Sequence, residues 1–365
     1  MTKLLYITNG IHGAAGLERV LSIKASLLAD EFGYDVHILT LNSLGQPLFY
    51  DFSSKIQLHD IQVSGNPISY IKQYISGVKK VIKEVQPDII SVCDDGLKAF
   101  FLPKINPINC AIIYERHVSK IIELGINPSF FQRTKVAVKF KLMNQLAKSF
   151  DRFVVLTNDN IAEWNLKNIL VISNPLSFNP NESSSLEAKK VIAVGRQNYQ
   201  KGFDLLLQSW QIINQKHPDW QLDIYGKFDK ALGLDKLAKE LNIEKSVFFH
   251  EPVKNIEQQY LTSSIYALSS RYEGFGMVLI EAMVCGVPCV SYDCPCGPSD
   301  IIKNEEDGFL VENGDYNEFA SKINRLIEDI TLRKEMGKKA KQNVLRYLPE
   351  TIVKQWDNLF KEILR

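Results

Sequence analysis

The sequence predicts an α/β protein made of two similar halves, each built around a parallel sheet. Its 365 residues suit two domains. Short apolar runs alternate with longer segments of helical periodicity, which is typical of βαβ units. The alternation restarts after a polar stretch near the midpoint of the chain. Hydrophobic residues make up 45% and charged residues 23%, an ordinary globular composition that excludes a disordered, collagen-like or small disulfide-rich protein.

The first half begins with a buried strand predicted at residues 3–8. The other predicted strands cover 35–41, 88–92, 111–114, 153–156 and 169–172, and helices cover 16–30, 70–85 and 136–149. Ser173-Asn174-Pro175 ends this half, and the following stretch is rich in Asn, Pro and Ser. Such a composition indicates a linker.

The second half repeats the pattern from residue 190. Predicted strands cover 190–194, 220–225, 247–250, 265–268 and 287–292, and helices cover 202–215, 231–241, 316–330, 332–344 and 351–364. Ligands of open α/β sheets bind outside the carboxyl ends of the strands. A cleft between the two sheets is therefore the expected site.

The strongest local signal runs from Ser269 to Pro288. A strand ends near Leu268, a Gly274-Phe275-Gly276 turn follows, and an apolar helix then stops at a glycine. The free N–H groups at the start of that helix favour an anion such as phosphate. Glu273 and Glu281 flank the turn and suit hydrogen bonds to sugar hydroxyls. The alternative is a tight turn beside a solvated Glu281, and the spacing alone does not separate the two.

A second signal is the loop from Gly195 to Gly202, which follows the first strand of the second half. Arg196 and Lys201 flank it, and two cations at this place suit a diphosphate. When this loop is considered alone, the interpretation of both residues as surface charges is favoured. The surface interpretation weakens because this loop and the Glu273 turn are expected at the same sheet edge.

The first half offers weaker signals. Gly10, Gly13 and Gly16 follow its first strand, but their spacing and the missing acid after Leu41 exclude a nicotinamide fingerprint. His117 stands at the carboxyl end of a strand, where it could reach a ligand or be merely packed.

No metal ligand set is expected. The sequence holds no Asp-x-Asp pair and no Walker pattern. Four cysteines lie between residues 285 and 296, but their spacing differs from that of a structural zinc site. No signal peptide or membrane span is visible either, so we expect a cytoplasmic protein with reduced cysteines.

The net charge of +1 argues against a nucleic-acid binder but hides an asymmetry. Residues 1–175 carry 19 basic and 15 acidic residues, whereas the remainder carries 24 and 27. Residues 124–150 contain no acid, and lysines there alternate with apolar residues. This segment is predicted either to lie on an anionic membrane surface or to pack as an ordinary helix with solvated lysines.

Several motifs together resemble the retaining family 4 glycosyltransferases, in particular enzymes of bacterial surface-polysaccharide or lipopolysaccharide assembly. The resemblance rests on Glu273-x7-Glu281 with Gly-Phe-Gly, on the Gly-Arg…Lys-Gly loop, on Ser173-Asn174-Pro175 and on the segment 286–311. It spans nearly the whole chain. It implies a GT-B fold, in which two Rossmann-like domains face a central cleft.

The resemblance also implies a division of the chain and a set of site residues. Residues 1–177 would form the acceptor-side domain, 178–189 the linker, 190–348 the nucleotide-sugar domain, and 349–365 a helix crossing back to the first domain. The residues that the family would use for catalysis and donor binding are Arg196, Lys201, Glu273, His117, Gly13, Gly16, Gly195, Gly274, Phe275, Gly276, Met277 and Glu281. Arg196 and Lys201 would bind the diphosphate, Glu273 the sugar, Glu281 the ribose, and His117 the C6 hydroxyl. His250 departs from the family, where glycine is frequent, and puts contacts to the base in doubt.

The predicted function is metal-independent, retaining transfer of a hexose or N-acetylhexosamine. The donor would be a nucleotide sugar, with UDP favoured, and the acceptor a saccharide or a lipid-linked acceptor. No cofactor is expected, and a peripheral contact with the inner face of the cytoplasmic membrane through 124–150 is a further expectation. Two other hypotheses stay open: a non-hydrolysing nucleotide-sugar epimerase, and a catalytically silent nucleotide-sugar-binding scaffold.

Overall fold

The computed structural model describes residues 1–13, 15–120, 122 and 128–365. Its internal contacts divide the chain into two compact units. The first unit contains residues 1–177 and 349–365, and the second contains residues 178–348. Residues 178–189, expected as a linker, form no helix or strand and group with the second unit.

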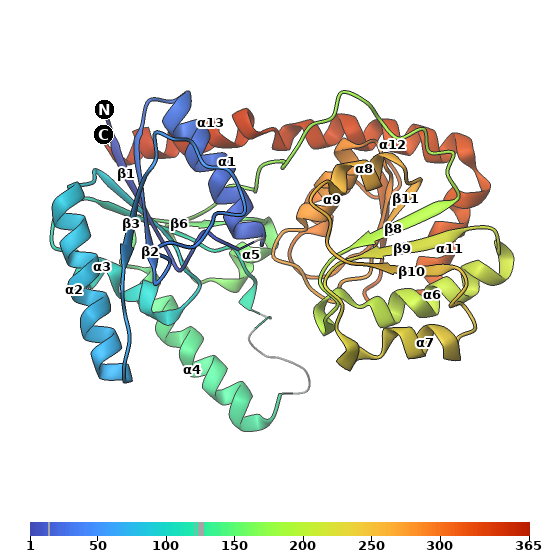
Figure 1. Cartoon of the computed structure of the whole chain (residues 1–365), viewed down its shortest axis with the longest axis horizontal. Coiled ribbons are helices and arrows are strands. Elements are labelled where there is room, and N and C mark those ends of the chain that lie inside the picture. The colour runs from blue at the N-terminus through green and yellow to red at the C-terminus, as the bar shows by residue number, and fades with distance from the viewer. Residues whose placement is uncertain (14, 121, 123–127) are drawn as a thin grey trace. The chain divides into compact units, whose positions relative to one another are not determined.

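The first unit is built on a parallel sheet of seven strands in the order β3-β2-β1-β4-β5-β6-β7 (Figure 1). The strands are β1 Lys3–Thr8, β2 Asp35–Leu41, β3 Gln57–Ile61, β4 Ile89–Cys93, β5 Ala111–Glu115, β6 Arg152–Val155 and β7 Ile169–Val171. The strand order reverses between β1 and β4. Ligands of doubly wound sheets bind beside such a reversal.

Helices cover both faces of this sheet (Figure 1). They are α1 Gly16–Asp30, α2 Pro67–Val85, α3 Leu102–Ile105, α4 Phe130–Ala147, α5 Asn158–Glu163 and α13 Pro349–Ile363, with a 3-10 turn η1 at Leu97–Phe101. Tyr6 of β1 faces α1, whereas Leu5 and Ile7 share a core with α2 and α4. The last helix, α13, packs along α1, and the Tyr34 hydroxyl donates to Asp357 Oδ1 at 3.0 Å.

The second unit has a parallel sheet of six strands in the order β10-β9-β8-β11-β12-β13. The strands are β8 Lys190–Val194, β9 Gln221–Tyr225, β10 Val247–His250, β11 Ile265–Leu268, β12 Cys289–Tyr292 and β13 Gly308–Val311. Its α-helices are α6 Phe203–Lys216, α7 Leu234–Glu240, α8 Ile256–Leu261, α9 Met277–Val284, α10 Pro298–Ile301, α11 Tyr316–Glu328 and α12 Ile330–Val344. Short 3-10 turns lie at η3 Tyr199–Lys201, η4 Lys230–Leu232 and η5 Leu345–Tyr347. Trp210 of α6 is fully buried in its core, and its indole N–H donates to Ser246 Oγ at 3.0 Å.

Helix α4 begins at Phe130, earlier than the predicted start at residue 136. The Ser129 hydroxyl accepts from the backbone N–H of Gln132, and the Gln132 side chain accepts from the backbone N–H of Ser129. This capping box satisfies two backbone groups at the helix start and fixes where the helix begins. The buried residues of α4 lie near its other end, at Met143, Leu146 and Ala147.

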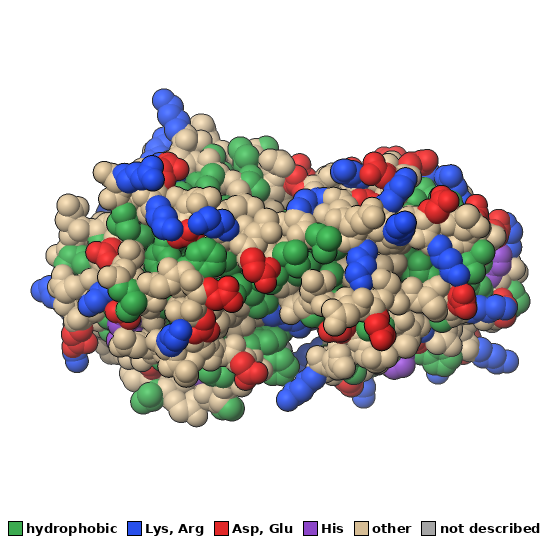
Figure 2. Space-filling model, turned by 90° about the horizontal axis from the view of Figure 1, so that it is seen from above, with side chains coloured by type: hydrophobic (Ala, Val, Ile, Leu, Met, Phe, Trp, Pro, Cys, Tyr) green, Lys and Arg blue, Asp and Glu red, His purple; other side chains and the backbone are tan. Residues whose placement is uncertain are grey.

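Charged side chains of both signs are interspersed on the face of each unit that Figure 2 shows. This matches the near balance of 43 basic and 42 acidic residues. Within the described part of the chain, no helix is both long enough and apolar enough to cross a membrane.

Candidate active site

Two loops of the second unit meet at the carboxyl ends of the neighbouring strands β8 and β11. Lys201 follows β8 and Glu273 follows β11, and Lys201 Nζ lies 2.7 Å from Glu273 Oε1. The Ser270 hydroxyl donates to the same carboxylate oxygen at 2.6 Å. The Glu273 side chain is only 7% exposed, so this is a mostly buried ion pair. A buried carboxylate needs such partners, and they fix its orientation.

A second ion pair ties the two loops together. Arg271 Nη2 lies 2.6 Å from Asp204 Oδ2, and the backbone N–H of Arg271 donates to the Gln200 carbonyl at 2.7 Å. The Ser269 hydroxyl also donates to the Lys201 carbonyl at 2.9 Å. Together these contacts hold the Lys201 and Glu273 backbones in place.

Two glycines make the close approach of these loops possible. A side chain at Gly202 would place its Cβ 2.1 Å from the Ser269 carbonyl oxygen, and its φ of +60° also favours glycine. The Lys201 stem runs over Gly195, where an added Cβ would meet it at 3.0 Å. Both predicted glycine positions therefore have a structural reason.

Helix α9 starts at the end of the Glu273 turn. Its N-cap is Gly276, with a φ of +99°, and no side chain caps its first N–H groups. Phe275 is buried edge-on against Tyr347, with ring centres 5.5 Å apart. A ligand at this turn would therefore meet the backbone of the Gly-Phe-Gly segment and the open end of α9.

Glu281 lies inside α9 and is 2% exposed. The Tyr260 hydroxyl donates to its Oε2 at 3.3 Å. The interpretation of Glu281 as a solvated helix residue is therefore wrong. Of the other predicted residues of this unit, Arg196 is exposed, and no ion pair to it is found among the described residues. Gly274 and Met277 are partly exposed.

His250 ends β10 and stacks on Tyr225, with ring centres 4.4 Å apart. Its Nε2 lies 3.1 Å from Asp223 Oδ1. The imidazole at this strand end is therefore held between a buried tyrosine and a carboxylate.

The remaining predicted residues belong to the first unit. Gly13 lies in the loop between β1 and α1, Gly16 is the first residue of α1, and His117 follows β5. His117 Nε2 lies 3.3 Å from Glu115 Oε2, while its Nδ1 is buried without a hydrogen-bond partner in the described chain. Lys24 pairs with the same carboxylate and stands 4.0 Å from the centre of the Trp356 ring.

The buried cluster of Glu115, Lys24 and His117 changes the pKa of its carboxyl group. Burial alone would raise the pKa of Glu115, but Lys24 and His117 outweigh it and lower the pKa to about 2. Potential ligand atoms of Cys93, Glu115 and His117 lie within 4.8 Å of one another. The Lys24 ammonium already neutralises this carboxylate, so a second cation would be repelled there.

Sequence reasoning missed the loop after β4. Asp94 is 2% exposed, and its carboxylate lies 3.1 Å from Lys98 Nζ. Asp95 Oδ1 lies 3.2 Å from Arg116 Nη1. The signal was present, because an Asp-Asp-Gly run follows directly after a strand of five buried residues.

Comparison with known proteins identifies the family. The family model described as glycosyl transferases group 1 matches residues 178–343, and a glycosyl transferase 4-like model matches residues 16–94. An uncharacterized glycosyltransferase of Haemophilus influenzae is 32% identical over 368 residues, covering 98% of this chain and 100% of the relative. An amylovoran biosynthesis glycosyltransferase of Erwinia amylovora is 31% identical over 373 residues, covering 98% and 99%.

A solved structure shares the fold. The Staphylococcus aureus protein TarM, as a mutant in complex with fondaparinux, α-GlcNAc-glycerol and UDP, superposes with a TM-score of 0.80 at 18% identity, covering 99% of this chain and 100% of that one. The two Rossmann-like units are thus those of the GT-B fold. With full-length relatives above 30% identity, the chain belongs to the group 1 glycosyltransferases.

Proposed function

We propose that this glycosyltransferase transfers a hexose or an N-acetylhexosamine from a nucleotide sugar to a saccharide or lipid-linked acceptor of a bacterial surface glycan. The observation that carries the proposal is the buried Lys201–Glu273 pair beside the uncapped start of α9. The name of the Erwinia relative supports polysaccharide synthesis, and the UDP in the TarM complex supports UDP as the nucleotide.

Each group of this site has a chemical task in the proposal. Lys201 and Arg196 oppose the negative charge of the departing diphosphate, and the open N–H groups of α9 add to that stabilisation. Glu273 accepts hydrogen bonds from sugar hydroxyls. Glu281 does the same for the ribose. The roles of His117, Gly13 and Gly16 rest on the family resemblance and stay predictions.

We propose retention of the anomeric configuration. The bond between the sugar C1 and the diphosphate oxygen breaks, and a bond between C1 and the acceptor oxygen forms on the same face. The acceptor hydroxyl gives its proton to the leaving phosphate oxygen, so no protein base is consumed. Charge on the diphosphate is balanced by Lys201, Arg196 and α9, and we therefore propose that no metal ion is needed.

We further propose that α4 contacts the anionic inner face of the cytoplasmic membrane. Phe130 and Phe131 are 79% and 83% exposed, and no acidic residue occurs between 128 and 150. Lys135 and Lys141 are exposed on the same helix. Figure 1 shows the Phe130 end of α4 projecting away from the sheet of the first unit. Exposed aromatic rings beside lysines fit a lipid surface. Residues 124–127 of the predicted segment lie outside the described residues.

A thermal-shift screen of UDP-, GDP- and ADP-sugars tests the donor assignment. A donor present at about a hundred times its dissociation constant stabilises the native state by about 2.7 kcal/mol. We expect this for a UDP-sugar, and no stabilisation by any nucleotide sugar would contradict the proposal. Conversion of the donor without an acceptor would indicate an epimerase, and binding without any turnover would indicate a silent scaffold.

A further inference from the structure

A lysine and a glutamate of the first unit form an ion pair inside its core, beside His117. Lys24 lies on the buried face of α1 and Glu115 ends β5, and each residue is only 1% exposed. The Lys24 ammonium donates to Glu115 Oε2 and lies 4.0 Å from the centre of the Trp356 ring. The Ser91 hydroxyl donates to the other oxygen, Oε1, at 2.5 Å. Replacing a buried ion pair by apolar side chains often costs no stability, so packing alone does not explain this pair.

His117 is the third member of this cluster, and its two ring nitrogens have different surroundings. Nε2 lies 3.3 Å from Glu115 Oε2, the oxygen that also accepts from Lys24. A carboxylate oxygen only accepts, so Nε2 carries a proton. Nδ1 is buried without a hydrogen-bond partner among the described residues, and the whole side chain is 8% exposed. Nδ1 is therefore an acceptor if the ring is neutral, and a donor if the ring is an imidazolium.

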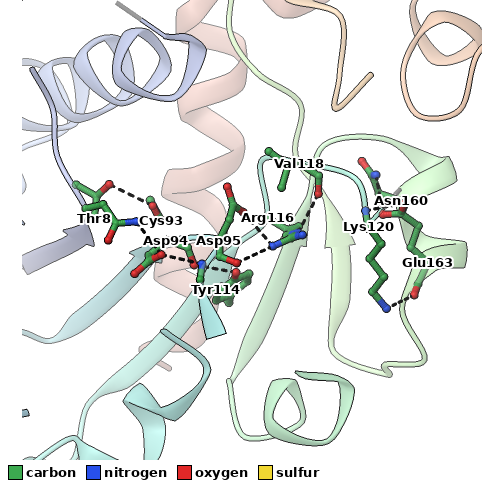
Figure 3. Close-up of polar contacts among 12 residues, drawn as sticks. Thr8, Cys93, Asp94, Asp95, Tyr114, Arg116, Val118, Lys120, Asn160 and Glu163 are labelled. Carbon is green, nitrogen blue, oxygen red and sulfur yellow. Dashed lines mark hydrogen bonds and ion pairs between the residues drawn. The ribbon is translucent and has the colours of Figure 1, made fainter. Parts of the chain in front are cut away.

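The charges around the ring favour its neutral form. Lys24 balances Glu115, and Arg116 balances Asp95, whose Oδ1 lies 3.2 Å from Arg116 Nη1 (Figure 3). The backbone N–H of His117 donates to the same Asp95 carboxylate. These two acids and two cations sum to zero without a charge on the imidazole. An imidazolium would also be repelled by the Lys24 ammonium at the oxygen that both contact.

We infer that Lys24 and Glu115 are positioning residues of the active site, which hold His117 neutral with its proton on Nε2 and its Nδ1 as a hydrogen-bond acceptor. A ligand group that meets Nδ1 must then donate, as a sugar hydroxyl does, whereas an ionised carboxylate or phosphate cannot. Such a hydroxyl supplies the partner that the buried Nδ1 lacks. The inference rests on the proposed function in placing a hydroxyl of the donor sugar at His117, while the state of the ring is a property of the protein without ligand.

Long-range ¹H–¹⁵N NMR correlations of the full chain, labelled with ¹⁵N-histidine, test the state of the ring. His117→Gln identifies the His117 signals among those of the six histidines. We expect the neutral tautomer with the proton on Nε2 at pH 7. Lys24→Met keeps an unbranched stem beside Trp356 but removes the balancing charge, so His117 should become an imidazolium. Lys72→Met, at an exposed position of α2, is the control and should leave the signals unchanged.

The double variant Lys24→Met with Glu115→Gln removes both charges and tests the same relationship by rescue. The imidazolium of the single variant should disappear, because no unbalanced carboxylate remains. The tautomer should no longer be fixed, because an amide can either accept from Nε2 or donate to it. A role of the pair in packing alone would produce neither change.

Donor selectivity supplies a readout on the proposed chemistry. UDP-glucose and UDP-glucuronic acid differ in one group, a hydroxymethyl in the first and a carboxylate in the second. We expect calorimetric titration to show that wild type prefers UDP-glucose, since Nδ1 accepts from a hydroxyl. In Lys24→Met this preference should fall at least about tenfold, because an imidazolium donates to a carboxylate.

Three results would overturn the inference: an imidazolium or an Nδ1-protonated tautomer in wild type, a neutral ring in Lys24→Met, or the same donor preference in wild type and Lys24→Met. If Lys24→Met does not fold, the wild-type tautomer and the released tautomer of the double variant decide the question. Failure of wild type to bind either UDP-sugar counts against the proposed function alone, because the NMR measurement needs no ligand.

Discussion

Lys201 Nζ lies 2.7 Å from Glu273 Oε1, although 72 residues separate them in the chain. The parallel sheet brings them together, because β8 and β11 are neighbours and both loops leave from the same edge. In our proposal, the lysine is the cation for the diphosphate and the glutamate is the acceptor for sugar hydroxyls. The relationship is the structural centre of the proposed chemistry.

Glu281→Gln should weaken donor binding more than it slows turnover. Glu281 is buried in α9 and is proposed to accept from the ribose, and a neutral amide accepts less strongly than a carboxylate. We expect KM for the nucleotide sugar to rise about tenfold, equivalent to about 1.4 kcal/mol, and kcat to stay within about threefold. Steady-state kinetics measure both, with the exposed Glu306→Gln as control. An unchanged KM would remove Glu281 from the donor site.

Gly202→Ala and Gly233→Ala form a matched pair. Their φ values are +60° and +63°, so the backbone penalty of about 1 kcal/mol should be similar. At Gly233 nothing lies within 4 Å of the added Cβ, whereas at Gly202 the Ser269 carbonyl oxygen lies at 2.1 Å. We expect the free energy of unfolding to fall by about 1 kcal/mol at Gly233 and by about 3 kcal/mol or more at Gly202. Urea unfolding measures both, and equal losses would show that the loop contact is unimportant.

The Glu115 cluster should make the first unit sensitive to acid. The pKa of Glu115 falls from 4.5 to about 2 on folding, so its contribution is full above about pH 4.5 and is lost as the pH falls towards 2. The full contribution is about 3 kcal/mol. Hydrogen exchange on peptides of the first unit should show Glu115→Gln less stable than wild type at pH 7, with the gap narrowing below about pH 4.5. A gap independent of pH would contradict this, and the exposed Glu31→Gln is the control.

The membrane contact of α4 is tested by sedimentation with vesicles. Phe130→Ser combined with Phe131→Ser should lower the fraction bound to phosphatidylglycerol-containing vesicles at least about fivefold, because the two rings supply apolar area. Ile68→Ser combined with Ile71→Ser on α2 is the control, since these side chains are also exposed, by 68% and 55%. Equal loss in both pairs, or no binding of wild type to anionic vesicles, would contradict the proposal. If vesicle binding falls with salt but is unchanged by the double phenylalanine substitution, the partner is a polyanion rather than a lipid surface.

Much of the fold could be predicted because buried parallel strands are short apolar runs. The strands β1 and β8 have the predicted bounds, since both are buried between helix layers. Strand β3 was not predicted, because Gln57–Ile61 is a half-exposed edge strand without an apolar run. Helix α8 was missed as well, since six residues are too short to show a period.

The site was only partly predictable for a related reason. Lys201 and Glu273 carry a recognisable spacing, and the sheet brings them together as expected. The Arg271–Asp204 ion pair and the Asp94–Asp95 loop have no such pattern, since charged loop residues usually face water. These residues meet their partners because their loops follow neighbouring strands. Strand order is a property of the folded chain, so the sequence alone does not indicate these contacts.

Donor turnover by wild type and Lys201→Ala, each in excess chelator, tests the central claim most directly. The account predicts that wild type consumes a nucleotide sugar under these conditions and that Lys201→Ala is slower by about a hundredfold. Lys201→Ala should lower turnover more than it lowers the stability of the fold. The control Lys227→Ala, on an exposed position of the same unit, should match wild type. Equal activity of wild type and Lys201→Ala would contradict the role of Lys201. Activity that vanishes with chelator and returns with magnesium would contradict the metal-free mechanism.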